Sequence, residues 1–121
     1  MQTLNKIIEL VGAPGNAVGS VSFGIAPCRL RGIQVVYTGQ GAATPVVVVT
    51  TTLDALVKTV FTLTGNSDFP LATVGELLVD DTGSPIALAY IAPVLSGQID
   101  IDVTAGDADA EGVTIWLVVE G

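Results

Sequence analysis

The sequence contains no histidine and a single cysteine, Cys28. Protein sites for zinc and iron draw most of their ligands from these two residue types, so we expect no metal and no cofactor of that kind. The same scarcity excludes Ser-His and Cys-His nucleophilic systems, and it excludes a disulfide within the chain. Most of the common combinations of catalytic residues are therefore excluded, and we expect a protein that is not an enzyme.

Charged residues are also scarce, at 13% of the 121 residues, whereas hydrophobic residues make up 50%. This composition argues against disorder, which requires low hydrophobicity and high charge. No apolar run approaches ~18 residues, so we expect neither a membrane span nor a membrane partner. The length suits a single β domain over residues 1–121, with residues 1–16 as a candidate N-terminal arm.

The charges that are present are unevenly distributed along the chain. Residues 1–58 contain all four basic residues and two acidic ones, whereas residues 59–121 contain ten acidic residues and no basic one. A strongly acidic half repels phosphate groups, so nucleic acid is not an expected partner. The asymmetry indicates that the two halves of the chain meet different surroundings.

Short runs rich in β-branched residues, separated by Gly, Pro and Asp turns, predict strands along most of the chain. Only residues 53–58 could form a helical turn. About seven to eight such strands predict an all-β fold, either an antiparallel β-sandwich or a jelly-roll-like barrel. The alternating apolar positions of the last two strands predict the core: Ile99, Ile101, Val103, Val113, Ile115 and Leu117.

Two predicted strands, residues 46–49 and residues 116–119, are apolar on both faces. An isolated sandwich exposes one face of each sheet, so such strands indicate additional cover from another molecule. We expect a homo-oligomer, with a trimer favoured, or docking on a larger partner. The candidate interface residues are Val47, Val49 and Trp116, with Arg29 and Arg31 as ion-pairing residues.

The stretch Asp81-Thr82-Gly83-Ser84 matches the signature that carries the catalytic aspartate of aspartic proteases. In those enzymes two aspartates share one proton and activate a water molecule. Apolar residues usually precede the signature, but here Asp80 does, and the residues around it suit a hairpin turn. We therefore predict a turn. A hydrolase that uses Asp81 in a homodimer remains an alternative, which a meeting of two Asp81 carboxylates would support.

Residues 106–112 place Asp107, Asp109 and Glu111 at alternating positions, a spacing similar to that of a calcium-binding loop. The full EF-hand spacing is absent and the flanking segments are predicted strands, so we favour a solvated acidic turn and leave cation binding open. A ligand-binding β-sandwich is a further alternative. It would require a concave strip of aromatic side chains, and aromatic residues make up only 5% of the chain.

The order of strands and turns over roughly the last two-thirds of the chain resembles a known family. The β-branched strand at residues 46–52 leads to Phe61-Thr62-Leu63-Thr64 and to Gly65-Asn66-Ser67-Asp68-Phe69-Pro70. The turn at residues 80–83, Pro93-Val94, Gly97, the Ala-Gly-Asp-Ala-Asp turn and the closing strand at residues 113–120 follow. This order resembles small all-β virion proteins of tailed bacteriophages, of the head-decoration or capsid-cement type.

The resemblance implies a non-catalytic β-sandwich, often a trimer, that docks on the assembled shell of the major capsid protein. It implies synthesis in the host cytoplasm and a final location on the capsid surface of the virion. Because burying unpaired ions is costly, we expect residues 1–45, where charge is sparse, to face the shell. The acidic turns at Asp80-Asp81 and at residues 106–112 are then expected to point away from it.

Overall fold

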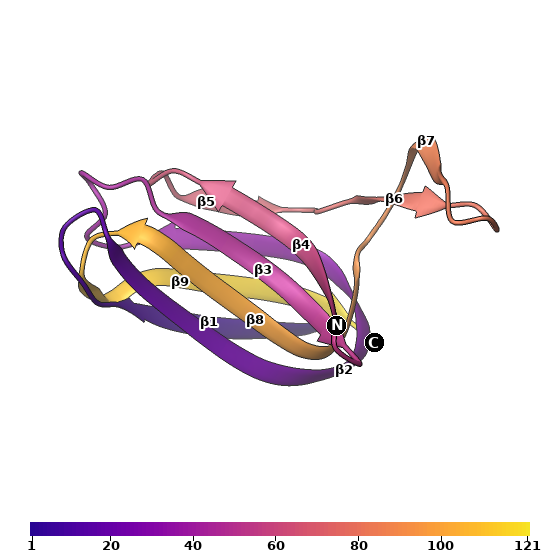
Figure 1. Cartoon of the computed structure of the whole chain (residues 1–121), viewed down its shortest axis with the longest axis horizontal. Coiled ribbons are helices and arrows are strands. Elements are labelled where there is room, and N and C mark those ends of the chain that lie inside the picture. The colour runs from indigo at the N-terminus through magenta and orange to yellow at the C-terminus, as the bar shows by residue number, and fades with distance from the viewer.

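The computed structural model describes residues 1–121 and contains nine strands and no helix (Figure 1). The strands are β1 (Gln2–Leu10), β2 (Ala17–Tyr37), β3 (Val46–Leu53), β4 (Leu56–Thr64), β5 (Phe69–Ala72), β6 (Glu76–Val79), β7 (Pro85–Ile91), β8 (Val94–Gly106) and β9 (Asp109–Glu120). All paired strands are antiparallel, which confirms the predicted fold class. No helix is present that could cross a membrane.

The two layers of the sandwich are joined through β2, which is 21 residues long. Residues 17–29 of β2 pair with β8, and residues 29–37 pair with β9. One layer therefore has the order β1-β9-β2-β5, and the other has the order β2-β8-β3-β4. The sheet does not close on itself, so the structure is a sandwich rather than a barrel.

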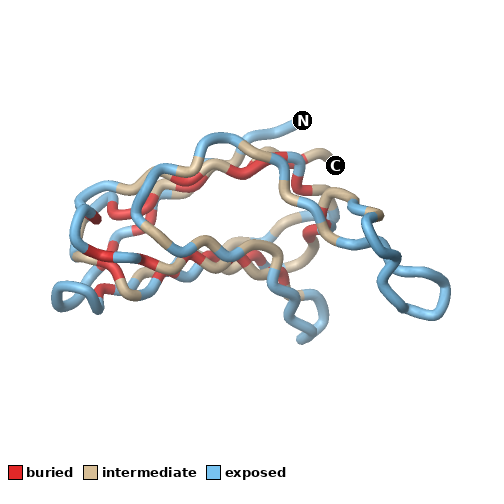
Figure 2. The backbone as a smooth tube through the Cα atoms, turned by 90° about the horizontal axis from the view of Figure 1, so that it is seen from above, coloured by how far each residue is buried: buried red, intermediate tan, exposed pale blue.

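The core lies between these layers, as the buried positions in Figure 2 show. Strands β8 and β9 contribute alternate residues to it, because successive side chains of a strand point to opposite faces. All six predicted core residues are at most 1% exposed, so the predicted alternation is confirmed. Val47 and Val49 are also 0% exposed. The prediction that they form an interface is wrong, because no partner can reach them.

Residues 1–16 do not form an arm. Residues 2–10 are strand β1, which pairs with β9 from Gln2 opposite Val119 to Leu10 opposite Asp109. Ile8 and Leu10 are buried in the core. The prediction of an N-terminal arm is therefore wrong for this strand, because its apolar side chains close one layer of the sandwich.

The segment at residues 53–58, expected as the one helical turn, is the turn of the β3–β4 hairpin instead. Asp54 and Ala55 adopt φ angles of 52° and 67°. Left-handed conformations at both central residues are typical of the tight turn that matches the twist of two antiparallel strands. The pairing of β3 with β4, from Val46 to Leu53, imposes this turn and overrides the local preference for a helical turn.

Strands β6 and β7 form a separate hairpin that projects from one end of the sandwich (Figure 1). We call residues 73–93, which contain this hairpin and its two connections to the sandwich, the arm. With the two strands of the arm, the chain has nine strands, more than the seven to eight that the sequence predicts.

Candidate functional site

The arm exposes apolar side chains that no part of the sandwich covers. Leu77, Leu78 and Val79 are consecutive and 38%, 39% and 59% exposed, while Leu88 and Tyr90 on the other strand are 86% and 63% exposed. Consecutive residues of a strand point to opposite faces, so both faces of the hairpin are apolar. A two-stranded hairpin is marginally stable in water by itself. The arm therefore has the character of a segment that binds another surface.

The tip of the arm is the predicted turn, held by Asp80. Its Oδ1 accepts hydrogen bonds from the Thr82 hydroxyl at 2.7 Å, the Thr82 amide at 2.9 Å and the Ser84 amide at 3.0 Å. These bonds, the hydroxyl first, lower the pKa of Asp80, because they stabilise its ionised form. Asp81 lies exposed in the same turn, which confirms the predicted turn.

The base of the arm is fastened to the sandwich by polar contacts. Lys58 Nζ lies 3.1 Å from Glu76 Oε2, and Arg29 Nη1 donates a hydrogen bond of 2.9 Å to the Ala92 carbonyl. Exposed ion pairs of this kind contribute ~0–1 kcal/mol to stability. They orient the arm without giving it a core of its own.

The two long sides of the sandwich differ in how they are closed. On one side, Phe61 of β4 packs against Phe69 of β5, with ring centroids 5.5 Å apart. On the other side, β1 and β2 are joined near their turn by a pair of 3.0 Å hydrogen bonds between Val11 and Val18. Beyond this point the two strands separate and leave a pocket of about 530 Å³. We call this pocket the open side.

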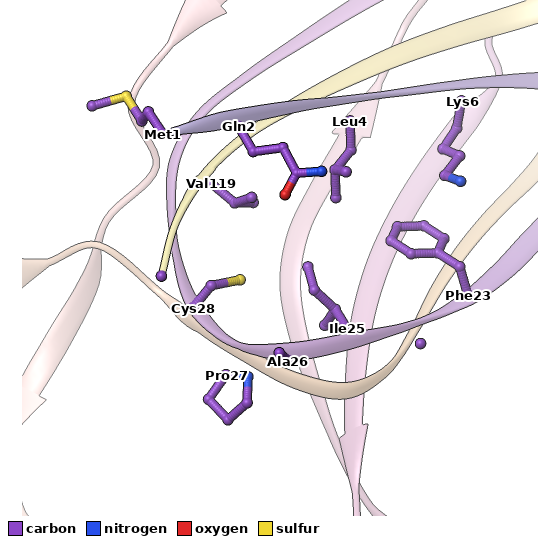
Figure 3. Close-up of a pocket in the computed structure, with 12 residues that line it drawn as sticks. Met1, Gln2, Leu4, Lys6, Phe23, Ile25, Ala26, Pro27, Cys28 and Val119 are labelled. Carbon is purple, nitrogen blue, oxygen red and sulfur yellow. The ribbon is translucent and has the colours of Figure 1, made fainter.

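The open side is an apolar pocket with one charged side chain, Lys6 (Figure 3). Leu4 and Lys6 of β1 face Phe23 and Ile25 of β2 across it, and Cys28 lies beside the terminal residues. The Lys6 ammonium lies 4.4 Å from the centroid of the Phe23 ring, within the range of a cation–π interaction. Burial raises the pKa of the Cys28 thiol. No Asp or Glu lines the pocket, so it lacks an acid–base pair.

The two arginines predicted as interface residues have partners within the chain. Arg29 holds the arm through Ala92, as described above. Arg31 Nη2 lies 2.8 Å from Glu120 Oε1, and both side chains are 43% exposed. The pairing of either arginine with an acid of another molecule stays a prediction, and the carboxylate of Glu120 already compensates Arg31.

Trp116 lies on the outer face of the β1-β9-β2 layer, opposite Asn5 of β1 and Gln34 of β2. The neighbouring outward positions carry no charge; they are Thr3, Ile7, Gly32, Val36, Thr114 and Val118. We call these residues, together with Trp116, Asn5 and Gln34, the uncharged face. The outer face of the other layer instead carries Asp100 and Asp102. Hydrogen bonds from Ser22 and Gln98 lower the pKa of Asp100.

The end of the sandwich opposite the arm is polar and well hydrogen-bonded. The Gln40 side chain, 3% exposed, donates to the Thr38 and Asp107 carbonyls at 3.0 and 2.8 Å and accepts from the Asp107 amide at 2.7 Å. Asp109 Oδ1 accepts a hydrogen bond of 2.8 Å from the Glu111 amide. These acids form no group suited to a metal ion.

The two acidic turns lie at opposite ends of the molecule, one at the tip of the arm and one between β8 and β9 (Figure 1). The expectation that both turns point away from a shell stays a prediction. The aromatic residues are likewise dispersed. Phe23 lines the open side, Trp116 lies on the uncharged face and Tyr90 is on the arm, so these three do not form the concave strip that a ligand-binding sandwich would need.

No known family model, curated protein or solved structure matches this chain. Trp116 was expected from the sequence as an interface residue, and that role stays a prediction, whereas the arm and the open side were not expected from the sequence. The arm has a signal in the sequence: three consecutive apolar residues, 77–79, between Gly75 and Asp80 break the alternation expected of a half-buried strand.

Proposed function

We propose that this chain is a structural virion protein that binds and stabilises the assembled capsid of a tailed bacteriophage, without a catalytic role. The observation that carries the proposal is the uncharged face centred on Trp116. The resemblance of the strand and turn order to head-decoration proteins supports the same function. The expected partner is the major capsid protein, and the expected location is the outer surface of the capsid.

The uncharged face suits docking on a rigid protein shell for two physical reasons. Its burial removes no ion from water, so the large desolvation cost of unpaired charges does not arise. A tryptophan at its centre offers the kind of side chain that most often dominates the energy of an interface. Leu71, 61% exposed and close to Gly32, extends the apolar area at one edge.

The opposite outer face suits contact with solvent. Asp100 and Asp102 place two carboxylates at its centre, and the chain as a whole has a net charge of −8. Charge of one sign on the outside of a particle limits association between particles. This orientation replaces the expectation that residues 1–45 face the shell, because the uncharged face takes strands from both halves of the chain.

Binding to assembled shells tests the proposal. Shells of the major capsid protein encoded in the same phage genome are mixed with the purified chain and sedimented, and their resistance to heat is measured. We expect the chain to sediment with the shells and to raise the temperature at which they break. A chain that stays in the supernatant at micromolar concentration would overturn the proposal.

Matched variants locate the docking surface. Trp116→Glu places a charge on the uncharged face, and Thr104→Glu places one on the opposite outer face. Binding to shells is expected to weaken at least about tenfold for Trp116→Glu and to persist for Thr104→Glu. Thermal unfolding of both variants verifies that each is folded. Equal binding by the two variants would contradict the assignment of the uncharged face.

A further inference from the structure

The arm and the open side are two unpartnered features of the same chain, and neither belongs to the uncharged face. None of the residues that line the open side comes from the arm. The arm projects outward beyond the end of the sandwich (Figures 1 and 2). The open side is therefore not covered by the arm of the same copy.

We propose that the arm of one copy packs over the open side of a second copy. Leucines and tyrosine on the arm supply the apolar side chains, and Leu4, Phe23 and Ile25 supply a pocket of about 530 Å³ to receive them. Burying such side chains stabilises an association by about 25 cal/mol for each Å² of apolar area removed from water. Both uncovered surfaces are removed from water by a single contact.

Charge complementarity identifies a second copy as the occupant. The arm carries Asp80 and Asp81 at its tip and no basic residue, and Glu76 at its base is already paired with Lys58. Lys6 is the one charged side chain of the open side. Arg31 in the neighbouring pocket is already paired with Glu120, which lines the same pocket, whereas Lys6 forms no ion pair within the chain. Two arms packed against each other would bring the Asp80 and Asp81 carboxylates of both copies together, which is repulsive. An arm placed against the open side instead brings carboxylates toward Lys6.

The backbone of the open side also favours an added segment. One edge of β1 pairs with β9 and one edge of residues 19–28 of β2 pairs with β8, while their other edges face the opening without a strand partner. Free strand edges are sites at which another chain adds by main-chain hydrogen bonds. A contact of arm to open side joins different surfaces of the two copies, so successive copies form a ring if the rotation closes.

The single cysteine permits a direct test, because Cys28 lies in the open side. A chain carrying Cys28→Ser and Leu88→Cys is mixed with a size-tagged wild-type chain and oxidised at mildly alkaline pH, where thiolate forms more readily. The control chain carries Cys28→Ser and Leu56→Cys. Leu56 is 79% exposed, similar to Leu88, but lies outside the arm.

We expect a disulfide between the introduced thiol at position 88 and Cys28 of the tagged chain, identified by mass and by peptide mapping. The control is expected to give at least about tenfold less of the mixed product. A product that joins only two arms, or equal yields from the two chains, would overturn the proposal. So would sedimentation of the wild-type chain as a monomer at high concentration.

Charge reversal gives an independent test in solution. Lys6→Glu is expected to weaken self-association about tenfold or more, and Asp81→Lys in the same chain is expected to restore it in part. An unchanged dissociation constant for Lys6→Glu would contradict the proposal. This inference does not rest on capsid docking, since a chain that forms the mixed disulfide but does not bind shells would refute only the proposed function.

Discussion

Ile101 and Leu88 are both aliphatic residues on strands, yet Ile101 is 0% exposed in the sandwich and Leu88 is 86% exposed on the arm. The difference follows from the pattern around each residue. In β8, apolar residues alternate with polar ones, so one face enters the core and the other meets water. In β7, which contains Leu88, apolar residues are consecutive, so no placement on a single layer can bury them all.

The two regions also differ in what holds them. The sandwich is held by a core of 16 buried apolar residues drawn from both layers. The arm is held by the short pairing of β6 with β7, by the turn at Asp80 and by the polar contacts at its base. The comparison teaches that the buried core of the sandwich provides the stability of the chain, whereas the arm adds little to it and leaves apolar side chains exposed.

The largest effect is expected in the core. Ile101→Ala should lower the free energy of unfolding by ~2–5 kcal/mol, because it removes buried methyl groups and leaves a cavity. Chemical denaturation of the variant and the wild type measures this loss. Asp102→Ala, the next residue on the outer face, is the matched control and should change stability by no more than ~0.5 kcal/mol. Similar values for the two variants would mean that the core is not where the structure places it.

A smaller loss is expected at the polar end. Gln40→Ala should cost ~1–3 kcal/mol, since it leaves the part-buried Asp107 amide and two carbonyls without their partner. Gln98→Ala, which changes an exposed glutamine, should be nearly neutral. Denaturation midpoints of both variants provide the comparison. A neutral Gln40→Ala would show that water replaces the amide at no cost.

Removal of the arm should affect association far more than folding. Replacing residues 75–91 with a short Gly-Ser linker should lower the free energy of unfolding by less than about 1 kcal/mol, since the arm adds little to the core. Sedimentation equilibrium should show that the shortened chain no longer self-associates. Loss of cooperative unfolding in this variant would show that the arm is part of the sandwich after all.

Asp81→Asn should leave stability within ~0.5 kcal/mol of the wild type, because Asp81 is exposed. Thermal unfolding measures this, and a peptidase assay accompanies it. Inhibitor-sensitive peptidase activity that disappears in Asp81→Asn would revive the hydrolase alternative.

The smallest effect concerns the ionisation of Asp80. Its pKa is lowered in the folded chain, so its hydrogen bonds stabilise the turn above the ordinary carboxyl pKa, and this contribution is lost as the pH falls through the lowered value. Thr82→Ala removes the first of these donors and should raise the pKa of Asp80 toward its ordinary value. NMR titration of the carboxyl carbon measures the shift, and an unchanged pKa would show that the Thr82 hydroxyl does not reach Asp80 in solution.

The sequence predicted the parts of the fold that depend on local pattern. Alternation identified the core positions of β8 and β9, and the turn residues identified the tip at Asp80. The local sequence pattern could not show that β2 crosses between layers, or that residues 2–10 pair with the C-terminal strand. Both features depend on contacts between distant segments. For the same reason, the sequence did not predict that Val47 and Val49 are buried in the core, and it did not predict the open side.

Hydrogen exchange of the wild-type chain at low and high concentration tests the account most directly. In the dilute monomer, amides of residues 76–91 should exchange almost as fast as those of an unfolded chain, while those of residues 99–103 should remain protected. Above the association threshold, the amides of the arm and the free edges of β1 and β2 should become protected together. An arm that is as protected as β8 in the monomer, or that gains no protection on association, would contradict the account.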